Sequence, residues 1–264
     1  MSWTIATTCG RAAGTRCGWR GACPWGRRRT STRATGITRS TEVVLFDFGG
    51  TLDADGVHWG PRFHAAYRAA GGTLGYAAFG PLYQRADEML ARAAGIRRFG
   101  FRQMIETQTR LLRELVPDRA EVDAGRMAEQ FHAPARAIVT RNHAVLERLA
   151  RRYRLGIVSN FTGNLTHCLE ELGLAGLFTA VSDSTVVGAA KPDPRIFRET
   201  LGALGGARAE RAWMVGDNFE ADIGGAAGVG LRTCWLAPPD RAQPPGPDPT
   251  ARIARLPDIE RILD

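Results

Sequence analysis

The segment Val43–Asp53, VVLFDFGGTLD, constrains the fold more than any other part of the chain. Four apolar residues run directly into Asp47, and a Gly-Gly-Thr turn follows. A short apolar run that ends in turn residues is typical of a strand buried on both faces, as in a parallel sheet. Open parallel sheets bind ligands at the carboxyl ends of their strands. The segment therefore predicts a buried strand that carries a carboxylate to a ligand site, unless Asp47 only caps the turn.

The second half of the chain alternates between strand and helix patterns. The expected strands cover 155–158, 178–181, 212–215 and 232–236, and the expected helices cover 144–152, 164–172, 194–204 and 221–227. Such alternation indicates βαβ units and a parallel sheet. Residues 237–250 are too rich in proline for regular structure, and 257–263 are expected to close the fold with a helix.

The segment between the first strand and this alternation is different, because it contains amphipathic runs and no convincing strand. Helices are expected at 63–70, 82–94, 101–116 and 122–131, where apolar residues recur at helical spacing. The predicted fold class is therefore α/β. Residues 41–57 and 143–264 form a three-layer Rossmann-like core around a parallel sheet, and residues 58–142 form an inserted α-helical cap domain.

The net charge of +8 is concentrated at the N-terminus. Residues 1–40 contain eight arginines and no acidic residue, so the rest of the chain holds 27 basic and 27 acidic residues. Because the folded part is neutral, we expect it to have no nucleic-acid partner. Residues 1–40 show no periodicity and are expected to be a disordered or spuriously translated extension. An organellar transit peptide and a nucleic-acid-binding arm are the alternatives.

Hydropathy and cysteine spacing indicate the compartment. The chain has no run of 18 or more apolar residues, so we expect neither a membrane span nor a membrane partner. Cys168 and Cys234 stand alone, and no Cys/His spacing suggests zinc. Isolated cysteines fit a reducing compartment, so we expect a cytoplasmic protein. No feature of the sequence indicates an oligomeric state.

Polar residues follow four segments of the predicted sheet. They are Asp47 with Thr51, Ser159 with Asn160, Lys191, and Asp217 with Asp222. Since the carboxyl ends of parallel strands share one edge, we expect these groups to converge. Carboxylates this close would repel each other without a divalent cation, and hard oxygen ligands suit Mg²⁺. Lys191, the only lysine in the chain, could join Ser159 and Asn160 in a cradle for an oxyanion. This set predicts phosphoryl transfer to an aspartate.

The motifs FDFGGTLD, VSN, GAAKPDPRIF and VGDNFEAD stand in this order between residues 43 and about 236. Together they resemble the haloacid dehalogenase-like (HAD) superfamily, and within it the phosphatases that carry a helical cap after the first motif. The resemblance implies that Asp47 is the nucleophile that forms an aspartyl-phosphate. It also implies that Ser159 hydrogen-bonds a phosphoryl oxygen and that Lys191 neutralises the nucleophile and the phosphate.

The same resemblance implies a set of ligands for Mg²⁺ and for the substrate. The expected metal site comprises Asp47, the Gly49 carbonyl, Asp217 and Asp222. The expected substrate-binding residues are Thr51, Ser159, Asn160 and Lys191. With Mg²⁺ and Lys191 offsetting charge repulsion, a carboxylate nucleophile splits one difficult displacement into two easier ones.

Gly49 departs from the family pattern. The first family motif usually reads DxD, and its second aspartate exchanges protons with the leaving group and the attacking water. Gly49 has no side chain for this task, which is typically worth about 10²–10⁴-fold. The nearest candidates downstream are Asp53, Asp55, His58 and His64, although each also fits a turn, a cap or a surface position.

Three functions compete at this stage. The first is a Mg²⁺-dependent phosphatase that hydrolyses a small phosphorylated metabolite, with the cap selecting the substrate. The second is a 2-haloacid dehalogenase, which uses the same aspartate without a metal and has no need of Asp217 and Asp222. The third is a non-catalytic HAD-like binding protein, which Gly49 suggests but which gives no reason for the retained Asp47, Lys191 and Asp217.

Overall fold

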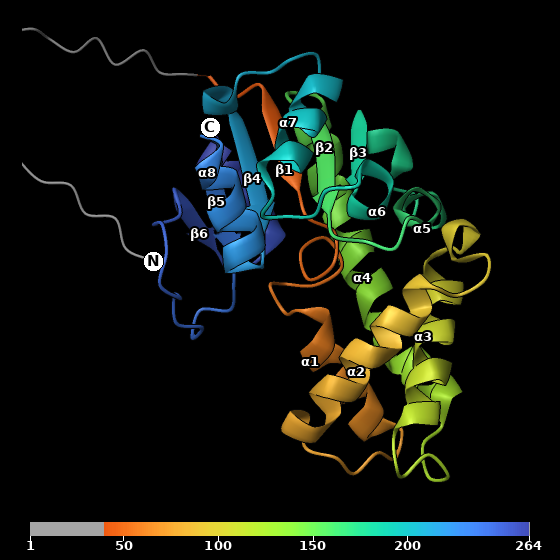
Figure 1. Cartoon of the computed structure of the whole chain (residues 1–264). Coiled ribbons are helices and arrows are strands. Elements are labelled where there is room, and N and C mark those ends of the chain that lie inside the picture. Colours follow the sequence, from red (N-terminus) through yellow and green to blue (C-terminus); the bar gives the residue numbers. More distant parts are fainter. Residues whose placement is uncertain (1–39, 264) are drawn as a thin grey trace, which may run out of the picture. The chain divides into compact units, whose positions relative to one another are not determined.

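The structure is a computed structural model and describes residues 40–263. Six strands form one sheet in the order β3-β2-β1-β4-β5-β6, and every neighbouring pair is parallel (Figure 1). The strands are β1 Val43–Phe46, β2 Arg154–Ser159, β3 Ala180–Asp183, β4 Ala212–Gly216, β5 Arg232–Leu236 and β6 Ala251–Ile253. The α/β class and the parallel sheet predicted from the sequence are confirmed. The prediction for residues 1–40 lies, apart from Ser40, outside the described residues.

The central strand β1 explains the layered arrangement. Its side chains alternate, so Val44 and Phe46 lie in one apolar cluster while Val43 and Leu45 lie in another. Helices α4 (Ala124–Ala150), α5 (Leu165–Glu171) and α9 (Glu260–Leu263) supply side chains to the first cluster. Helices α7 (Pro194–Ala203) and α8 (Gly225–Gly228) supply side chains to the second. Because helices cover both faces, all four residues of β1 are fully buried, which is why the strand reads as a continuous apolar run.

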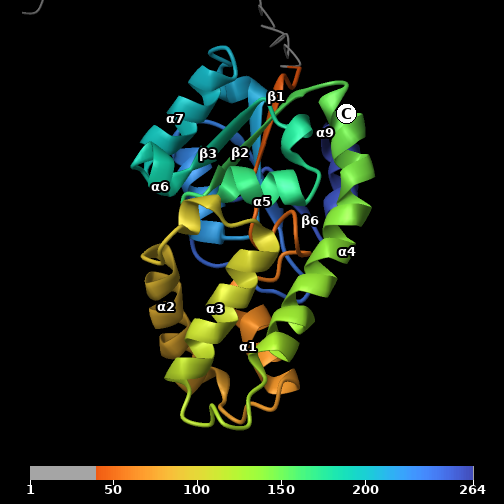
Figure 2. The same ribbon diagram turned by 90° about the vertical axis from the view of Figure 1, so that its right-hand side faces the viewer.

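The chain between β1 and β2 is helical. It forms α1 (Trp59–Ala69), α2 (Tyr76–Ala91), α3 (Phe101–Leu115) and α4, which pack around one another next to the carboxyl edge of the sheet (Figure 2). The amphipathic pattern of α3 places Phe101, Met104 and Leu112 in the interior. We refer to α1, α2, α3 and the first half of α4 as the cap. No helix within residues 40–263 combines the length and the apolar composition that a membrane span requires.

Helix α4 differs from the sequence-based expectation. Two separate helices were expected at 122–131 and 144–152, but the structure has one helix of 27 residues, Ala124–Ala150. Asp123 caps its start by accepting a hydrogen bond from Arg126 N at 3.0 Å. The helix continues through Pro134, because losing one backbone hydrogen bond does not outweigh an apolar stripe that runs its whole length. The expected boundary at residues 142 and 143 therefore lies inside a continuous helix.

Helices α1 and α2 begin at Trp59 and Tyr76, earlier than the expected 63 and 82, and further differences lie in the C-terminal third. The expected helix 221–227 is a π-helical turn, Phe219–Gly224, followed by the short α8, and such turns are frequent at functional sites. Strand β6 was not expected, because its three residues are too few to show a periodicity. The closing helix begins as a 3₁₀ turn at Leu256–Ile259 before α9, and residues 237–250 have no helix or strand, as expected. The remaining short elements are α6 (Ser184–Val187) and 3₁₀ turns at Ile96–Arg98, Ala175–Leu177 and Ala209–Arg211.

Candidate active site

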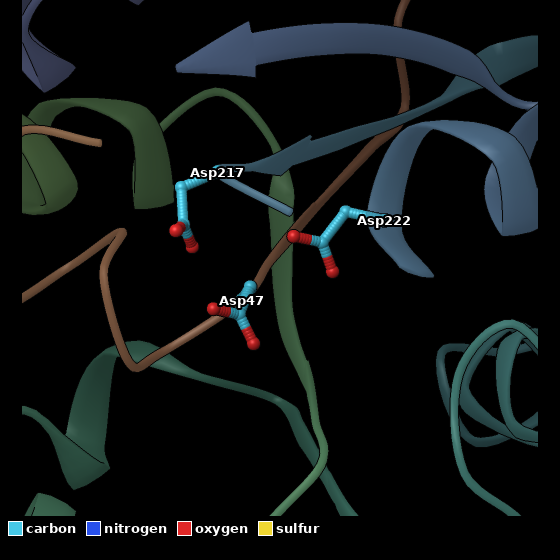
Figure 3. A group of neighbouring side chains, drawn as sticks. All are labelled: Asp47, Asp217 and Asp222. Atoms are coloured by element: carbon cyan, nitrogen blue, oxygen red, sulfur yellow. The ribbon is translucent and has the colours of Figure 1, made fainter. Parts of the chain in front are cut away.

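The carboxyl ends of β2, β1 and β4 bring three predicted residues together. Ser159 is the last residue of β2, Asp47 follows β1 and Asp217 follows β4, and these strands are neighbours in the sheet. Asp222 reaches the same place from the π-helical turn. Figure 3 shows the carboxyl groups of Asp47, Asp217 and Asp222 turned toward one another. One oxygen from each lies within 4.8 Å of the others, and all three residues are buried.

Lys191 joins the carboxylates. Its Nζ lies 2.6 Å from Oδ1 of Asp47 and 2.5 Å from Oδ1 of Asp222. Burial alone would lower the pKa of this ammonium, but the charges of Asp222 and Asp47 outweigh burial and raise the pKa above its usual value. Lys191 is therefore a fixed positive charge between two carboxylates.

Ser159, the last residue of β2, and Asn160, which follows it, hold this arrangement in place. The Ser159 hydroxyl donates a hydrogen bond to Oδ1 of Asp47 at 3.0 Å. The Asn160 side chain accepts from Lys191 N at 2.7 Å and donates to Lys191 O at 3.0 Å. Asn160 therefore fixes the backbone of Lys191 with its amide group, and this function was not anticipated from the sequence.

The charges of the cluster do not balance. Three carboxylates face one ammonium, and Oδ2 of Asp217 is buried without a hydrogen-bond partner among the described residues. Burial, followed by the charges of Asp47 and Asp222, raises the pKa of Asp217 well above its usual range. Burial also raises the pKa of Asp222, against the opposing effect of Lys191. Hard oxygen donors with surplus negative charge match the ligand preference of Mg²⁺. The residues present thus fit a divalent cation.

A cavity of about 400 Å³ opens above the cluster. Asp47, Gly49, Ser159, Asn160, Lys191, Asp217 and Asp222 all line it. Thr51 does not, because it is fully buried and its hydroxyl lies 3.4 Å from Oδ2 of Asp47 and 3.3 Å from Oδ1 of Asp217. The cap supplies the opposite wall with Tyr83, Asp87, Leu90, Ala91 and Met104. The cavity therefore combines a charged floor with a mixed polar and apolar wall.

Gly49 lies against an aromatic ring. A Cβ added at this position would stand 3.1 Å from both Cε2 and Nε1 of Trp59. The Trp59 ring packs edge-on against Phe48, Phe63, Phe101, Phe131 and Phe161. Its Nε1 donates to Oδ2 of Asp53 at 2.8 Å. The indole thus fills the space next to Gly49 and is held there from several sides.

Three of the four candidate replacements for the missing acid are engaged elsewhere. Asp53 is fully buried and accepts from Gly50 N, Trp59 Nε1 and Arg62. Asp55 forms a bidentate ion pair with Arg141, at 2.6 and 2.9 Å. His64 contacts Leu74 O at 2.9 Å. Only His58, of these four, lines the cavity that contains Asp47.

Trp59, Tyr83 and Asp87 are the contributors that the sequence did not identify as functional. Asp53 was a candidate proton carrier, but in the structure it anchors the loop after β1 and the Trp59 ring that fills the space beside Gly49. The polar face of α2, which carries Tyr83 and Asp87, is indistinguishable in sequence from a solvated helix face. No sequence signal could have identified these two residues, because their position depends on how α2 packs over the sheet.

Comparisons with known proteins identify the family of the chain. The profile of the haloacid dehalogenase-like hydrolase family matches residues 41–230. The chain is 32% identical to a phosphoserine phosphatase from Thermus thermophilus over 235 residues, which is 83% of this chain and 90% of that protein. It is 35% identical to the pyrimidine 5'-nucleotidase YjjG from Escherichia coli over 150 residues, which is 55% of this chain and 67% of that protein.

Solved structures show the same fold. The HAD-hydrolase YfnB from Bacillus subtilis, solved with bound magnesium, has a TM-score of 0.54 and 22% identity, and covers 85% of this chain and 99% of its own. An L-2-haloacid dehalogenase from Xanthobacter autotrophicus has a TM-score of 0.53 and 19% identity, over 84% of this chain and 98% of its own. Phosphatase relatives and dehalogenase neighbours therefore share this architecture, and the fold does not distinguish between their activities.

Proposed function

The chain belongs to the haloacid dehalogenase-like hydrolase family, and we propose that within this family it is a Mg²⁺-dependent phosphatase of small phosphomonoesters. The observation that carries the proposal is the charge imbalance of the buried cluster, above all the unpartnered Oδ2 of Asp217. A hydrolase that works without a metal has no use for these surplus carboxylates. A divalent cation would offset two negative charges, which is the excess that three carboxylates and one lysine leave.

We assign the metal ligands to Asp47, the Gly49 carbonyl, Asp217 and Asp222, with Asp222 shared with Lys191. When bound, Mg²⁺ supplies positive charge that polarises a phosphoryl oxygen and reduces its repulsion of the nucleophile. Thr51 holds the side chains of Asp47 and Asp217 from behind the cavity. The location of its hydroxyl favours this positioning role over the direct substrate contact expected from the sequence.

The remaining residues act on the phosphoryl group. Asp47 attacks the phosphorus atom with one carboxylate oxygen, and the bond to the leaving oxygen breaks to give an aspartyl-phosphate. Lys191 offsets the negative charges of Asp47 and of the phosphoryl group. The Ser159 hydroxyl and the Asn160 backbone N–H bind phosphoryl oxygens. Water then attacks the phosphorus atom, releases inorganic phosphate and restores the Asp47 carboxylate.

The substrate is proposed to be a small phosphorylated metabolite, which the cap selects. The cavity of about 400 Å³ suits a ligand of that size. The relatives named for phosphoserine and for pyrimidine 5'-nucleotides are phosphomonoester hydrolases, which supports the same reaction class here. The two cysteines of the folded part are free, as expected in the cytoplasm, which we keep as the proposed compartment.

The test is hydrolysis of para-nitrophenyl phosphate by the full chain, with and without Mg²⁺, alongside a panel of metabolite phosphates. We expect Mg²⁺-dependent release of nitrophenolate and inorganic phosphate. The Asp47→Asn variant should lose activity by several orders of magnitude while keeping its fold. Asp240→Asn, in an exposed loop, is the matched control and should retain full activity.

The same preparation separates the competing functions. Metal-independent release of chloride from 2-chloropropionate, without phosphatase activity, would replace the proposal with a dehalogenase. If the protein hydrolyses neither the phosphate esters nor 2-chloropropionate, the remaining hypothesis is the non-catalytic binding protein. Substantial phosphatase turnover by Asp47→Asn would refute the assignment of the nucleophile.

A further inference from the structure

The reaction proposed above needs a proton donor and acceptor that Gly49 cannot provide. The described residues that line the cavity include seven ionisable side chains: Asp47, His58, Tyr83, Asp87, Lys191, Asp217 and Asp222. Asp47, Lys191, Asp217 and Asp222 form the charged cluster and are committed to one another. The remaining three, His58, Tyr83 and Asp87, are the candidates for the proton donor and acceptor.

Position separates these three residues. Asp47 and Lys191 are among the charges that act on the His58 ring. Tyr83 and Asp87 lie on α2, on the cap wall of the cavity. His58 instead precedes Trp59, whose indole lies 3.1 Å from the Cβ position of residue 49. His58 is therefore the candidate that combines a place at the helix start beside position 49 with an interaction with Asp47.

The start of α1 places the His58 ring at the cavity. His58 is the residue that caps this helix, and its Nδ1 lies 3.5 Å from Gly60 N, a long contact that is available only while Nδ1 carries no proton. Nε2 has no hydrogen-bond partner within residues 40–263, so it is the nitrogen that can exchange a proton while Nδ1 keeps its own. Trp59, the next residue, fills the space beside Gly49. One helix start thus fills that space and also presents an imidazole to the cavity.

We propose that His58 is the general acid and general base of the phosphatase reaction, in place of a carboxylate at position 49. This inference rests on the proposed function, since it assigns a residue to that reaction. The proposed catalytic group thus lies at the first turn of the cap rather than in the loop after β1.

The two half-reactions balance through one proton on His58. In the first, the Asp47 oxygen bonds to phosphorus, the bond from phosphorus to the leaving oxygen breaks, and the imidazolium gives its proton to that oxygen. An alcohol leaves, and His58 is neutral. In the second, neutral His58 takes a proton from water as the water oxygen bonds to phosphorus and the Asp47–phosphorus bond breaks. Inorganic phosphate leaves, and His58 is again an imidazolium.

Charges of both signs surround the His58 ring. Desolvation is the largest effect and holds the pKa of the ring below its usual value near 6.5, and Arg241 and Lys191 act in the same direction. Asp47 and Asp53 act in the opposite direction and raise the pKa. Glu220, which lines a second hollow together with His58 and Arg241, is the other charged group on that side. A group that must both give and accept a proton works best when its pKa lies near the working pH.

The experiment compares the full-length His58→Asn variant with wild type under rapid mixing with para-nitrophenyl phosphate and Mg²⁺. Asparagine is a good helix N-cap, so it can accept from Gly60 N while carrying no exchangeable proton of suitable pKa. Nitrophenolate leaves without acid assistance, but the second half-reaction still needs a base. We expect a burst of one nitrophenolate per active site, then turnover about 10²–10⁴-fold slower than wild type. Mass spectrometry should find phosphate accumulated on the peptide that contains Asp47.

A second substrate tests the acid half of the role. With an alkyl phosphate, whose leaving group needs a proton, the same variant should show no burst and no accumulated phosphoenzyme, because the first half-reaction is then also slow. His167→Gln, an exposed histidine outside the cavity, is the control and should behave as wild type with both substrates. Thermal melting verifies that His58→Asn is folded.

The outcomes separate this inference from the proposed function. If wild type hydrolyses no phosphate ester, the proposed function fails. If wild type is active and His58→Asn turns over at the same rate, or slows equally on both esters without accumulating phosphoenzyme, His58 is not the proton carrier. A burst in Asp87→Asn but not in His58→Asn would assign the role to Asp87 on α2.

Discussion

The indole of Trp59 lies 3.1 Å from the point where a Cβ on residue 49 would stand. This distance is tighter than ordinary van der Waals contact, and the ring cannot easily retreat, because Asp53 bonds its Nε1 and five phenylalanines surround it. Glycine at position 49 thus matches the close approach of Trp59, and the missing carboxylate goes together with the position of this ring.

The Gly49→Ala variant should be destabilised. The added methyl group forces the Trp59 ring to shift, and overpacking of this kind typically costs about 1–3 kcal/mol. Urea unfolding of the full chain measures the change. Gly202→Ala is the matched control, since Gly202 lies in α7 with no atom near its added Cβ, and it should be stabilised by about 0.5–1 kcal/mol. Equal effects of the two substitutions would contradict the packing argument.

Restoring the carboxylate with Gly49→Asp should not raise the rate. The side chain has no room beside Trp59, and a fourth carboxylate would join a cluster that already holds excess negative charge. We expect lower kcat with both good and poor leaving groups in steady-state assays. An increase on alkyl phosphates would show that the site tolerates the acid and that position 49 can carry the proton.

Replacing Lys191 with methionine should lower stability as well as abolish activity. The substitution leaves Asp47 and Asp222 buried without their cation, and breaking a buried ion pair from one side typically costs about 3–5 kcal/mol. Chemical denaturation checks the expected loss. The exposed Arg198→Met on α7 removes a positive charge from the surface and should change stability little.

Mg²⁺ should raise the melting temperature, more at pH 7 than at pH 5. Burial raises the pKa values of Asp217 and Asp222 above those of the unfolded chain, so the metal-free fold loses stability as pH rises from about 4 through the raised values. A bound cation restores the stability that the ionised carboxylates cost. At lower pH, protons compete with the cation for Asp217 and Asp222. At 100 times its Kd, a ligand adds about 2.7 kcal/mol to stability. Asp217→Asn should abolish most of the thermal shift, whereas an equal shift in this variant would remove Asp217 from the ligand set.

The Asp87→Asn variant should change substrate preference. Asp87 is a negative charge on the cap wall of the cavity, and no arginine lines that cavity within residues 40–263. Its loss should shift the kcat/KM ratio toward leaving groups that carry a carboxylate and away from those that carry an ammonium. We expect a change of about tenfold, equivalent to about 1.4 kcal/mol. Phosphoglycolate and phosphoethanolamine are suitable probes, and Glu88→Gln, whose side chain does not line the cavity, is the control.

The core could be predicted from sequence because its signals are local. β5 was predicted at its observed bounds, 232–236, and β1 was evident from the apolar run that ends at Asp47. The meeting of Asp47, Ser159 and Asp217 followed from the rule that parallel strands share one edge, whereas Lys191 reaches them from the turn between α6 and α7. Their catalytic roles remain predictions.

The cap was less predictable, because its features depend on long-range packing. The space that Trp59 takes from residue 49, and the inward direction of Tyr83 and Asp87, arise only once α1 and α2 lie over the sheet. The continuity of α4 could not be read from the sequence, because Pro134 lies between the two expected helices and a proline usually ends a helical pattern. The π-helical turn that holds Asp222 has no pattern that distinguishes it from an ordinary helix.

The unbroken α4 also bears on how substrate would enter and leave. Arg141 and Asn142 tie the middle of this helix to the loop after β1, through Asp55 and through Leu52 O. The part of α4 before this attachment is about 25 Å long at 1.5 Å per residue, so a tilt of about 5° moves its tip by about 2 Å. Any tilt of the cap about Arg141 and Asn142 would therefore be enlarged at the far end of α4. Substitutions at these two residues would then act on the cavity from a distance, without touching the residues that line it.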